Sequence, residues 1–321
     1  MKMSTNQSNA CLLSNDDKSG SGILYNGFFI VVATSSLLLD CLLLGVVGRR
    51  MSVHPDLYLI SGFVISNMIT SIGLFFSSIY RIWWWTAEPR CIHPSQCITD
   101  RFHVPMHMVG SDSLAFAMLL LSFERFLLFW RQKCHRIVFS PFCSTLWFIL
   151  ILLLSCLEVF FVYMDAVGQQ DKLISSMCHR KDYTSPSYYN AYTFTKVAMA
   201  VVCLVFYFLS YVIHRISIQQ NDSKTYLGTI RNSRRSAMLF NLLIIAFAIA
   251  FFHIAPLMLK PLSHSSPDIV KAAKIIHNIY LPLSTALCFV IHPFLLSTIQ
   301  RLFARWFILK KCRSTSVVYI G

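Results

Sequence analysis

The stretch Leu119–Trp130, which reads LLLSFERFLLFW, sets a Glu-Arg pair into an otherwise apolar run of helical length. A charged side chain in the middle of a membrane helix costs roughly 2.5–3.5 kcal/mol, so such a pair requires a polar edge or a function. The run extends back to Val104, with Asp112 as its other charge, and is long enough to cross a membrane. Glu124 and Arg125 therefore lie at one end of a spanning helix. They are either an interfacial pair whose Arg stem reaches water or a switch element facing the inside of a bundle.

The composition of the chain is typical of a membrane protein. Of its 321 residues, 55% are hydrophobic and only 13% are charged, with a mean hydropathy of +0.58. Soluble domains carry about a quarter charged residues. Residues 1–22 are polar, rich in Ser and Asn, and lack the apolar segment of a cleavable signal peptide. We therefore expect the first membrane helix to act as its own insertion signal.

Apolar runs separated by charged or Pro-containing breaks predict the membrane helices. Seven such runs follow one another: Ile23–Gly48, Leu57–Tyr80, Val104–Trp130, Phe142–Tyr163, Tyr189–Ile213, Ala237–Leu259 and Ala272–Thr298. The connections are short, and no internal repeat or soluble domain interrupts them. The expected fold is an all-α membrane protein: an N-terminal tail over residues 1–22, one seven-helix bundle over 23–298 and a C-terminal segment over 299–321.

The distribution of Lys and Arg predicts the orientation of the bundle, because cytoplasmic loops of membrane proteins carry an excess of both. With the N-terminus outside, most Lys and Arg residues fall on the inner face, whereas most acidic residues of the loops fall outside. The formal net charge of +14 then reflects membrane topology and does not indicate a nucleic-acid partner. This orientation places Glu124 and Arg125 at the cytoplasmic end of the third helix.

Two features of the outer segments agree with an external N-terminus. Asn6-Gln7-Ser8 is a glycosylation acceptor pattern, which is used only if the tail enters the lumen. Four cysteines lie in outer segments, where disulfides can form: Cys11, Cys91, Cys97 and Cys178. We predict a bond between Cys97 and Cys178, which would tie the loop before the third helix to the loop before the fifth. Cys91 is the competing partner, and a free thiol is the other alternative.

Together these features resemble the rhodopsin-like G-protein-coupled receptors, a family of seven-helix proteins with an outer N-terminus. Glu124-Arg125-Phe126 matches the first two positions of the triplet that ends the family's third helix, with Phe in place of the usual Tyr. Asn67 falls where the family's second helix usually has a sodium-linked Asp. Pro256 and Pro293 match the prolines of the sixth and seventh helices, and the resemblance spans residues 23–312.

The resemblance implies a switching mechanism and two partners. Proline removes an intrahelical hydrogen bond, so Pro256 would give the sixth helix a hinge about which its inner half can swing. In the family this swing opens a cleft beside Arg125 for a heterotrimeric G protein, and Glu124 is the expected resting partner of Arg125. After Pro293, an apolar stripe with arginines on the opposite face looks like the family's short eighth helix, lying on membrane lipids. Cys312 is a candidate palmitoylation site within this segment.

Polar groups on the outer halves of the helices are candidates for contact with a small-molecule ligand: His103, His107, Glu158, Lys196 and Tyr280. Intramembrane charges usually pair, so we expect Glu158 and Lys196 to form an ion pair, with or without ligand contact. Asp112 lies deeper, as a packing group or as part of a signal relay. His103 and His107 share a helix face, but two ligands without Cys or carboxylate support predict no metal site. No cofactor is expected.

The many aromatic residues and the weak motifs look most like the nematode serpentine chemoreceptors. That likeness implies a small, mostly apolar ligand and a place in the plasma membrane, in a sensory cilium for some such receptors. His107 stands where amine receptors of the family have an acidic anchor, so a biogenic amine is not the expected ligand. Ala286 stands where opsins carry the Lys that binds retinal, so retinal is not expected either. A neuropeptide receptor and a ligand-gated ion channel are the alternatives, although a channel of the insect odorant-receptor type would have the opposite orientation. No arrangement of side chains typical of an enzyme occurs.

Overall fold

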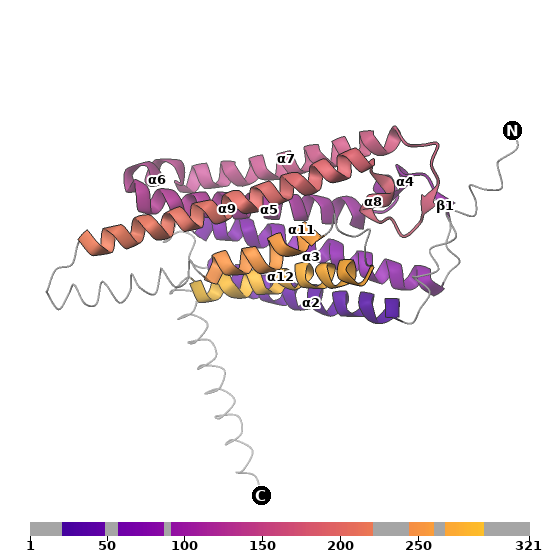
Figure 1. The fold of residues 1–321 in the computed structure, drawn as a ribbon, viewed down its shortest axis with the longest axis horizontal. Coiled ribbons are helices and arrows are strands. Elements are labelled where there is room, and N and C mark those ends of the chain that lie inside the picture. The colour runs from indigo at the N-terminus through magenta and orange to yellow at the C-terminus, as the bar shows by residue number, and fades with distance from the viewer. Residues whose placement is uncertain (1–20, 49–56, 87–90, 221–243, 260–266, 292–321) are drawn as a thin grey trace, which may run out of the picture.

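The computed structural model describes residues 21–48, 57–86, 91–220, 244–259 and 267–291, which form a bundle of long helices lying side by side (Figure 1). The long helices are α2 (Ser21–Gly48), α3 (Leu57–Thr86), α5 (His103–Trp130), α7 (Pro141–Val167), α9 (Pro186–Gln220) and α12 (Pro267–Ile291). The shorter elements are β1 (Cys91–Ile92), α4 (Gln96–Thr99), α6 (Gln132–Val138), β2 (Ile174–Ser175), α8 (Arg180–Tyr183), η2 (Ile249–Ile254) and α11 (Ala255–Leu259).

Five of these helices, α2, α3, α5, α7 and α9, are long and apolar enough to cross a membrane. They agree with the first five predicted runs, except that α3, α7 and α9 continue beyond Tyr80, Tyr163 and Ile213, because backbone hydrogen bonding does not stop where hydropathy falls. Their outward faces are apolar as well, and on α7 the side chains of Phe142, Leu153 and Phe160 are all exposed. An apolar surface of this extent suits lipid rather than water.

The last two predicted runs are described in part. Residues 244–254 form an apolar helix shorter than a membrane span, α11 continues it to Leu259, and α12 covers most of the seventh run. Pro256 lies in α11, directly after the π-helical segment η2. Proline cannot donate a backbone hydrogen bond and crowds the preceding turn, and a widened π-helical turn accommodates such a disruption. The predicted hinge residue therefore lies where the helix is irregular.

Two glycines let α3 and α5 pack backbone against backbone. A Cβ added to Gly73 would lie 2.6 Å from the Cα of His107, and one added to Gly110 would lie 2.7 Å from the Cα of Thr70. Small residues at such points let membrane helices approach closely, so that van der Waals contact replaces the hydrophobic effect that lipid does not provide. This contact fixes the distance between α3, which carries Asn67, and α5, which carries Glu124 and Arg125.

Different short elements close the two ends of the bundle (Figure 1). At one end β1 pairs antiparallel with β2, with Cys91 opposite Ser175, and α4 and α8 lie nearby. At the other end α6 connects α5 to α7, and α7 begins after Ser140, whose hydroxyl accepts a hydrogen bond from the Cys143 N–H. Ser before the helix and Pro141 at its first position are typical start signals. We call these the disulfide end and the α6 end.

Candidate functional site

At the α6 end, the buried carboxylate of Glu124 contacts two basic side chains. Its Oε2 lies 3.2 Å from Arg125 Nε, its Oε1 lies 2.7 Å from His135 Nε2, and its side chain is only 2% exposed. His135 belongs to α6, so one carboxylate ties the end of α5 to the connecting helix. We call Glu124, Arg125 and His135 the clasp. A carboxylate this buried fits an element facing the inside of the bundle better than an interfacial pair that reaches water.

Phe126, the third residue of the sequence triplet, is a packing residue. Its ring centroid lies 5.3 Å from that of Trp130 and 5.5 Å from that of Phe206 on α9. Aromatic rings at these separations attract one another beyond the effect of burial alone. Phe126 therefore couples the clasp-bearing end of α5 to α9, while the partly exposed Arg125 side chain remains accessible.

In the middle of the bundle, Asn67 on α3 joins α2 to α12. Its amide nitrogen lies 3.0 Å from Asp40 Oδ2 and 3.0 Å from the hydroxyl oxygen of Thr285, which itself donates to Asp40. All three side chains are buried. The family resemblance assigns an acid to the position of Asn67, but here the nearby acid is Asp40 on α2, which was not predicted. The sequence did contain a signal for Asp40, because it is the lone acidic residue within the first apolar run and a charge at membrane depth is usually functional.

Exchanging Asp40 and Asn67 tests this contact. Asp40→Asn should destabilise the protein by about 1.5–3 kcal/mol, because Asn67 and Thr285 lose a charged acceptor. The double variant Asp40→Asn/Asn67→Asp returns one carboxylate and one amide to the same place, so it should regain most of the lost stability. Thermal unfolding of the purified full-length chain measures both. A double variant less stable than either single variant would show that the two positions are not interchangeable.

Toward the disulfide end, four charged side chains form two ion pairs. Lys196 Nζ lies 2.5 Å from Asp112 Oδ1, and Arg180 Nη2 lies 3.1 Å from Glu158 Oε1. The predicted pair between Glu158 and Lys196 is therefore wrong. It failed because Asp112 on α5 takes Lys196, and because the loop between α7 and α9 supplies Arg180 to Glu158. Hydropathy identifies a charge within a helix but not which neighbour it faces.

Tyr192 on α9 links the two ion pairs. Its hydroxyl donates to Asp112 Oδ1 at 3.0 Å, and the Arg180 guanidinium lies over its ring, 3.4 Å from the centroid. We call Asp112, Glu158, Arg180, Tyr192 and Lys196 the charge cluster. Its two carboxylates balance its two cations, which is the arrangement expected of charges withdrawn from water.

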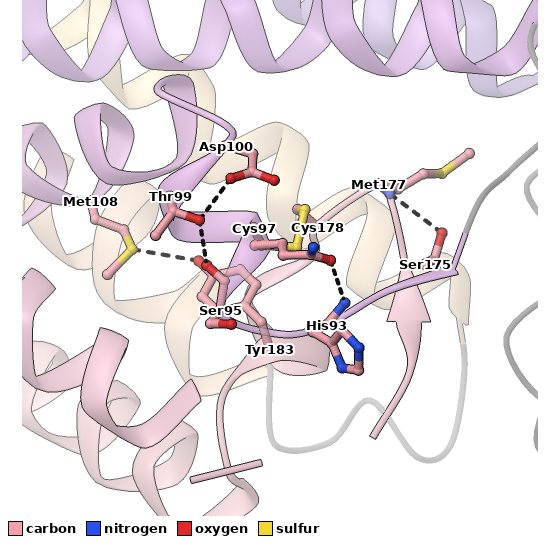
Figure 2. The surroundings of a disulfide bond; sticks show 11 residues. His93, Ser95, Cys97, Thr99, Asp100, Met108, Ser175, Met177, Cys178 and Tyr183 are labelled. Atoms are coloured by element: carbon pink, nitrogen blue, oxygen red, sulfur yellow. Dashed lines mark hydrogen bonds between the residues drawn. A yellow bond between two sulfur atoms is a disulfide. The ribbon is translucent and has the colours of Figure 1, made fainter. Parts of the chain in front are cut away.

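A disulfide joins Cys97 to Cys178 (Figure 2). It holds the loop that carries Arg180. This is the predicted pairing, and it is confirmed. Cys91, the competing candidate, is engaged in a different disulfide. Because Arg180 follows Cys178 by only two residues, the bond anchors the loop immediately beside the guanidinium. The disulfide therefore contributes to the charge cluster by fixing where Arg180 enters the bundle.

Burial controls the ionisation of the loop side chains beside the disulfide. It raises the pKa of Tyr183 to about 12 and holds the pKa of His179 well below its ordinary value. Tyr183 is thus neutral, and its hydroxyl donates to Met108 Sδ at 3.5 Å (Figure 2). Burial also works against the charged form of Arg180, but the nearby tyrosines and carboxylates raise its pKa above the ordinary value. Arg180 therefore remains charged.

The other predicted ligand residues have separate contacts. The His103 ring lies 4.9 Å from that of Tyr80, the backbone of His107 packs against α3, and the Tyr280 hydroxyl donates to Met118 Sδ at 3.0 Å. Within the described residues, no three His, Cys, Asp or Glu side chains are grouped as a metal site would require. The charge cluster thus includes two of the five predicted ligand residues.

Several predictions concern residues outside the described part of the chain. They are the switch proline Pro293, the glycosylation site Asn6, the palmitoylation site Cys312 and the amphipathic segment over residues 299–321. The first 20 residues of the predicted N-terminal tail lie outside it as well.

Comparison with known proteins identifies no family for this chain. No protein-family model matches the sequence, and no curated protein matches it significantly. A functional proposal therefore depends on the arrangement of side chains described above, and above all on the clasp.

Proposed function

We propose that the chain is a seven-transmembrane receptor of the rhodopsin-like class, which signals through a heterotrimeric G protein. The observation that carries the proposal is the clasp, a buried carboxylate that holds an arginine at the end of α5. Charges at membrane depth are costly and usually functional, and the family resemblance assigns this pair to the G-protein face. A disulfide between two loops at the opposite end and the irregular helix at Pro256 also support the proposal.

In this proposal, residues 244–259 belong to the sixth span, α12 is the seventh, and the N-terminus lies outside the cell. The disulfide end then faces the oxidising exterior, where disulfides persist. The α6 end faces the cytoplasm, in agreement with the excess of Lys and Arg expected there. Residues 299–321 would lie along membrane lipids at the inner face, and the receptor would act at the plasma membrane.

The proposed mechanism is a shift between two populations. A ligand bound between the helices favours a conformation in which the helix containing Pro256 swings outward, and Arg125 leaves Glu124 to contact the G protein. The clasp stabilises the resting conformation, because Glu124 holds Arg125 and His135 at the same time. As in chemosensory receptors, the expected ligand is a small and mostly apolar molecule.

Arg125→Ala should abolish G-protein activation while leaving expression and surface delivery intact. The variant removes the guanidinium, whereas Glu124 retains its contact with His135. Nucleotide exchange on a panel of purified G proteins measures coupling, and ligand-evoked current in cells, with and without a G-protein block, measures conduction. Arg131→Ala is the matched control, because this exposed arginine lies over the ring of Trp130 outside the clasp. Coupling that survives Arg125→Ala would contradict the proposal, and a current that survives both the variant and the block would indicate an ion channel.

His135→Ala should raise the basal rate of G-protein activation, up to about tenfold, because the resting state loses a hydrogen bond to a charged group. His135→Gln keeps a donor at this position, so it should remain closer to the natural protein. Lys133→Ala, an exposed change on the same short helix, controls for general effects on α6. Basal nucleotide exchange by purified protein is the readout. Equal basal rates in all three variants would exclude His135 from the resting clasp.

A further inference from the structure

Two atoms in the charge cluster have no hydrogen-bond partner among the described residues. One is Asp112 Oδ2, an acceptor on a side chain that is fully buried, and the other is Arg180 Nε, a donor. Both interactions of the Asp112 carboxylate go to its other oxygen, which receives Lys196 and the Tyr192 hydroxyl. The ion pair of Arg180 with Glu158 uses Nη2 and not Nε. The cluster therefore presents one unused acceptor and one unused donor.

An unpaired buried polar atom costs about 1–3 kcal/mol, so native proteins seldom leave two of them in one place. Here both belong to side chains that meet at Tyr192, since the Tyr192 hydroxyl contacts Asp112 and its ring lies under the Arg180 guanidinium. One small group could therefore satisfy both atoms.

We propose that the charge cluster binds the polar end of the receptor's ligand, an uncharged group that carries both a hydrogen-bond donor and an acceptor. The donor of this group donates a hydrogen bond to Asp112 Oδ2, and its acceptor accepts a hydrogen bond from Arg180 Nε–H. A primary amide at the end of an apolar chain has this chemistry. The inference rests on the proposed receptor function, and it refines the expected ligand from mostly apolar to an apolar body with an amide-like head.

The charge balance of the cluster explains why the group should be uncharged. Lys196 already neutralises Asp112, and Glu158 already neutralises Arg180. An ammonium or a carboxylate would add an unbalanced charge to a buried site, which is strongly unfavourable. A hydrocarbon end would leave both atoms unpaired, and a group with an acceptor alone would satisfy only Arg180. The site should therefore reject amines, acids and groups without a donor.

Thermal unfolding of the purified full-length chain in lipid nanodiscs tests this preference without requiring a G protein. The probes are straight-chain primary amides of two to ten carbons, each compared with its N,N-dimethyl amide, carboxylic acid and amine. A primary amide present at about 100 times its Kd should raise the unfolding midpoint by roughly 5 °C. Its N,N-dimethyl counterpart, which has no N–H, should need at least a tenfold higher concentration for the same shift.

Two variants locate the binding. Arg180→Lys keeps a positive charge beside Glu158 but removes Nε, and Asp112→Asn/Lys196→Met removes the opposite charges of the other pair together. Both variants should lose the stabilisation by primary amides, whereas Lys181→Ala, an exposed change on the same short helix, should keep it. Circular dichroism of each variant without probe establishes that it is folded. Stabilisation that is equal in natural protein and variants would place the amide elsewhere and overturn the inference.

The outcomes separate this inference from the proposed function. Selective stabilisation by primary amides, without any G-protein activation, would support the ligand site and contradict the receptor proposal. Coupling that depends on Arg125, together with equal binding of primary and dimethyl amides, would support the receptor and overturn the ligand site. If no probe raises the midpoint at millimolar concentration, water alone satisfies the two atoms and the inference is wrong.

Discussion

Replacing Gly110 with alanine should lower the unfolding midpoint of the protein by about 5 °C or more. The added Cβ would collide with the backbone nitrogen of Thr70 and lie 2.7 Å from its Cα. A flexible side chain could move aside, but a helix backbone cannot, so α3 and α5 would have to separate. Loss of this contact should cost about 3 kcal/mol or more. In Gly73→Ala the added Cβ would collide with the backbone of His107 on α5, so this variant should lower the unfolding midpoint as well.

Gly45→Ala is the matched control for this prediction. Gly45 also lies within an apolar helix, but a Cβ added there meets no atom within 4 Å. Alanine is a better helix former than glycine by about 1 kcal/mol, so this variant should be neutral or slightly more stable. Midpoints are measured on purified protein in one detergent or nanodisc preparation. If Gly110→Ala unfolds at the same temperature as Gly45→Ala, then α3 and α5 do not make the close contact described above.

Lys196→Met should destabilise the protein by about 3–5 kcal/mol, because it leaves the Asp112 carboxylate buried without its counter-ion. The side chains of this pair are only 7% and 0% exposed. The Tyr192 hydroxyl remains, but one neutral hydrogen bond does not replace a buried cation. Arg180→Met should cost less, because its pair with Glu158 is more exposed, at 18% and 23%. A larger loss of stability in Lys196→Met than in Arg180→Met would show that the more deeply buried pair contributes more.

A double variant shows whether the loss comes from the charge pair itself. Asp112→Asn/Lys196→Met removes both charges, so no uncompensated charge remains and stability should return to within about 1–2 kcal/mol of the natural protein. Glu158→Gln/Lys196→Met tests the pairing predicted from the sequence and should give no such rescue. Recovery with Glu158→Gln instead of Asp112→Asn would mean that Lys196 is paired with Glu158 after all. Thermal unfolding of all four variants provides the comparison.

Much of the architecture was predictable because it depends on properties that lie along the chain. The ends of α2 and α5 agree with hydropathy, since a span requires a minimum length of apolar residues whatever its neighbours are. The pairing of Cys97 with Cys178 was predictable because few cysteines lie in loops at the same end of the bundle. The Glu-Arg pair was conspicuous because two adjacent charges are rare at the end of so apolar a run.

The partners of the buried charges were not predictable in the same way. Glu158 and Lys196 occupy apolar helices as expected, but each turns toward a different partner, because packing sets the rotation of a helix about its axis. His135 and Arg180 come from connecting segments, which hydropathy treats as surface loops, and Asp40 meets Asn67 only because α2 packs against α3.

The sequence by itself therefore determined the membrane class of this protein, the places of its five long apolar helices along the chain and the cysteines that join its loops. Those features follow from length, hydropathy and chain order. Only the tertiary structure decided that Glu124 is held by His135 as well as Arg125, and that Asp112, Glu158, Arg180, Tyr192 and Lys196 meet in one cluster. The physical reason is that an ion pair needs two side chains within a few ångströms, and that distance depends on helix rotation and loop insertion, which no local pattern records.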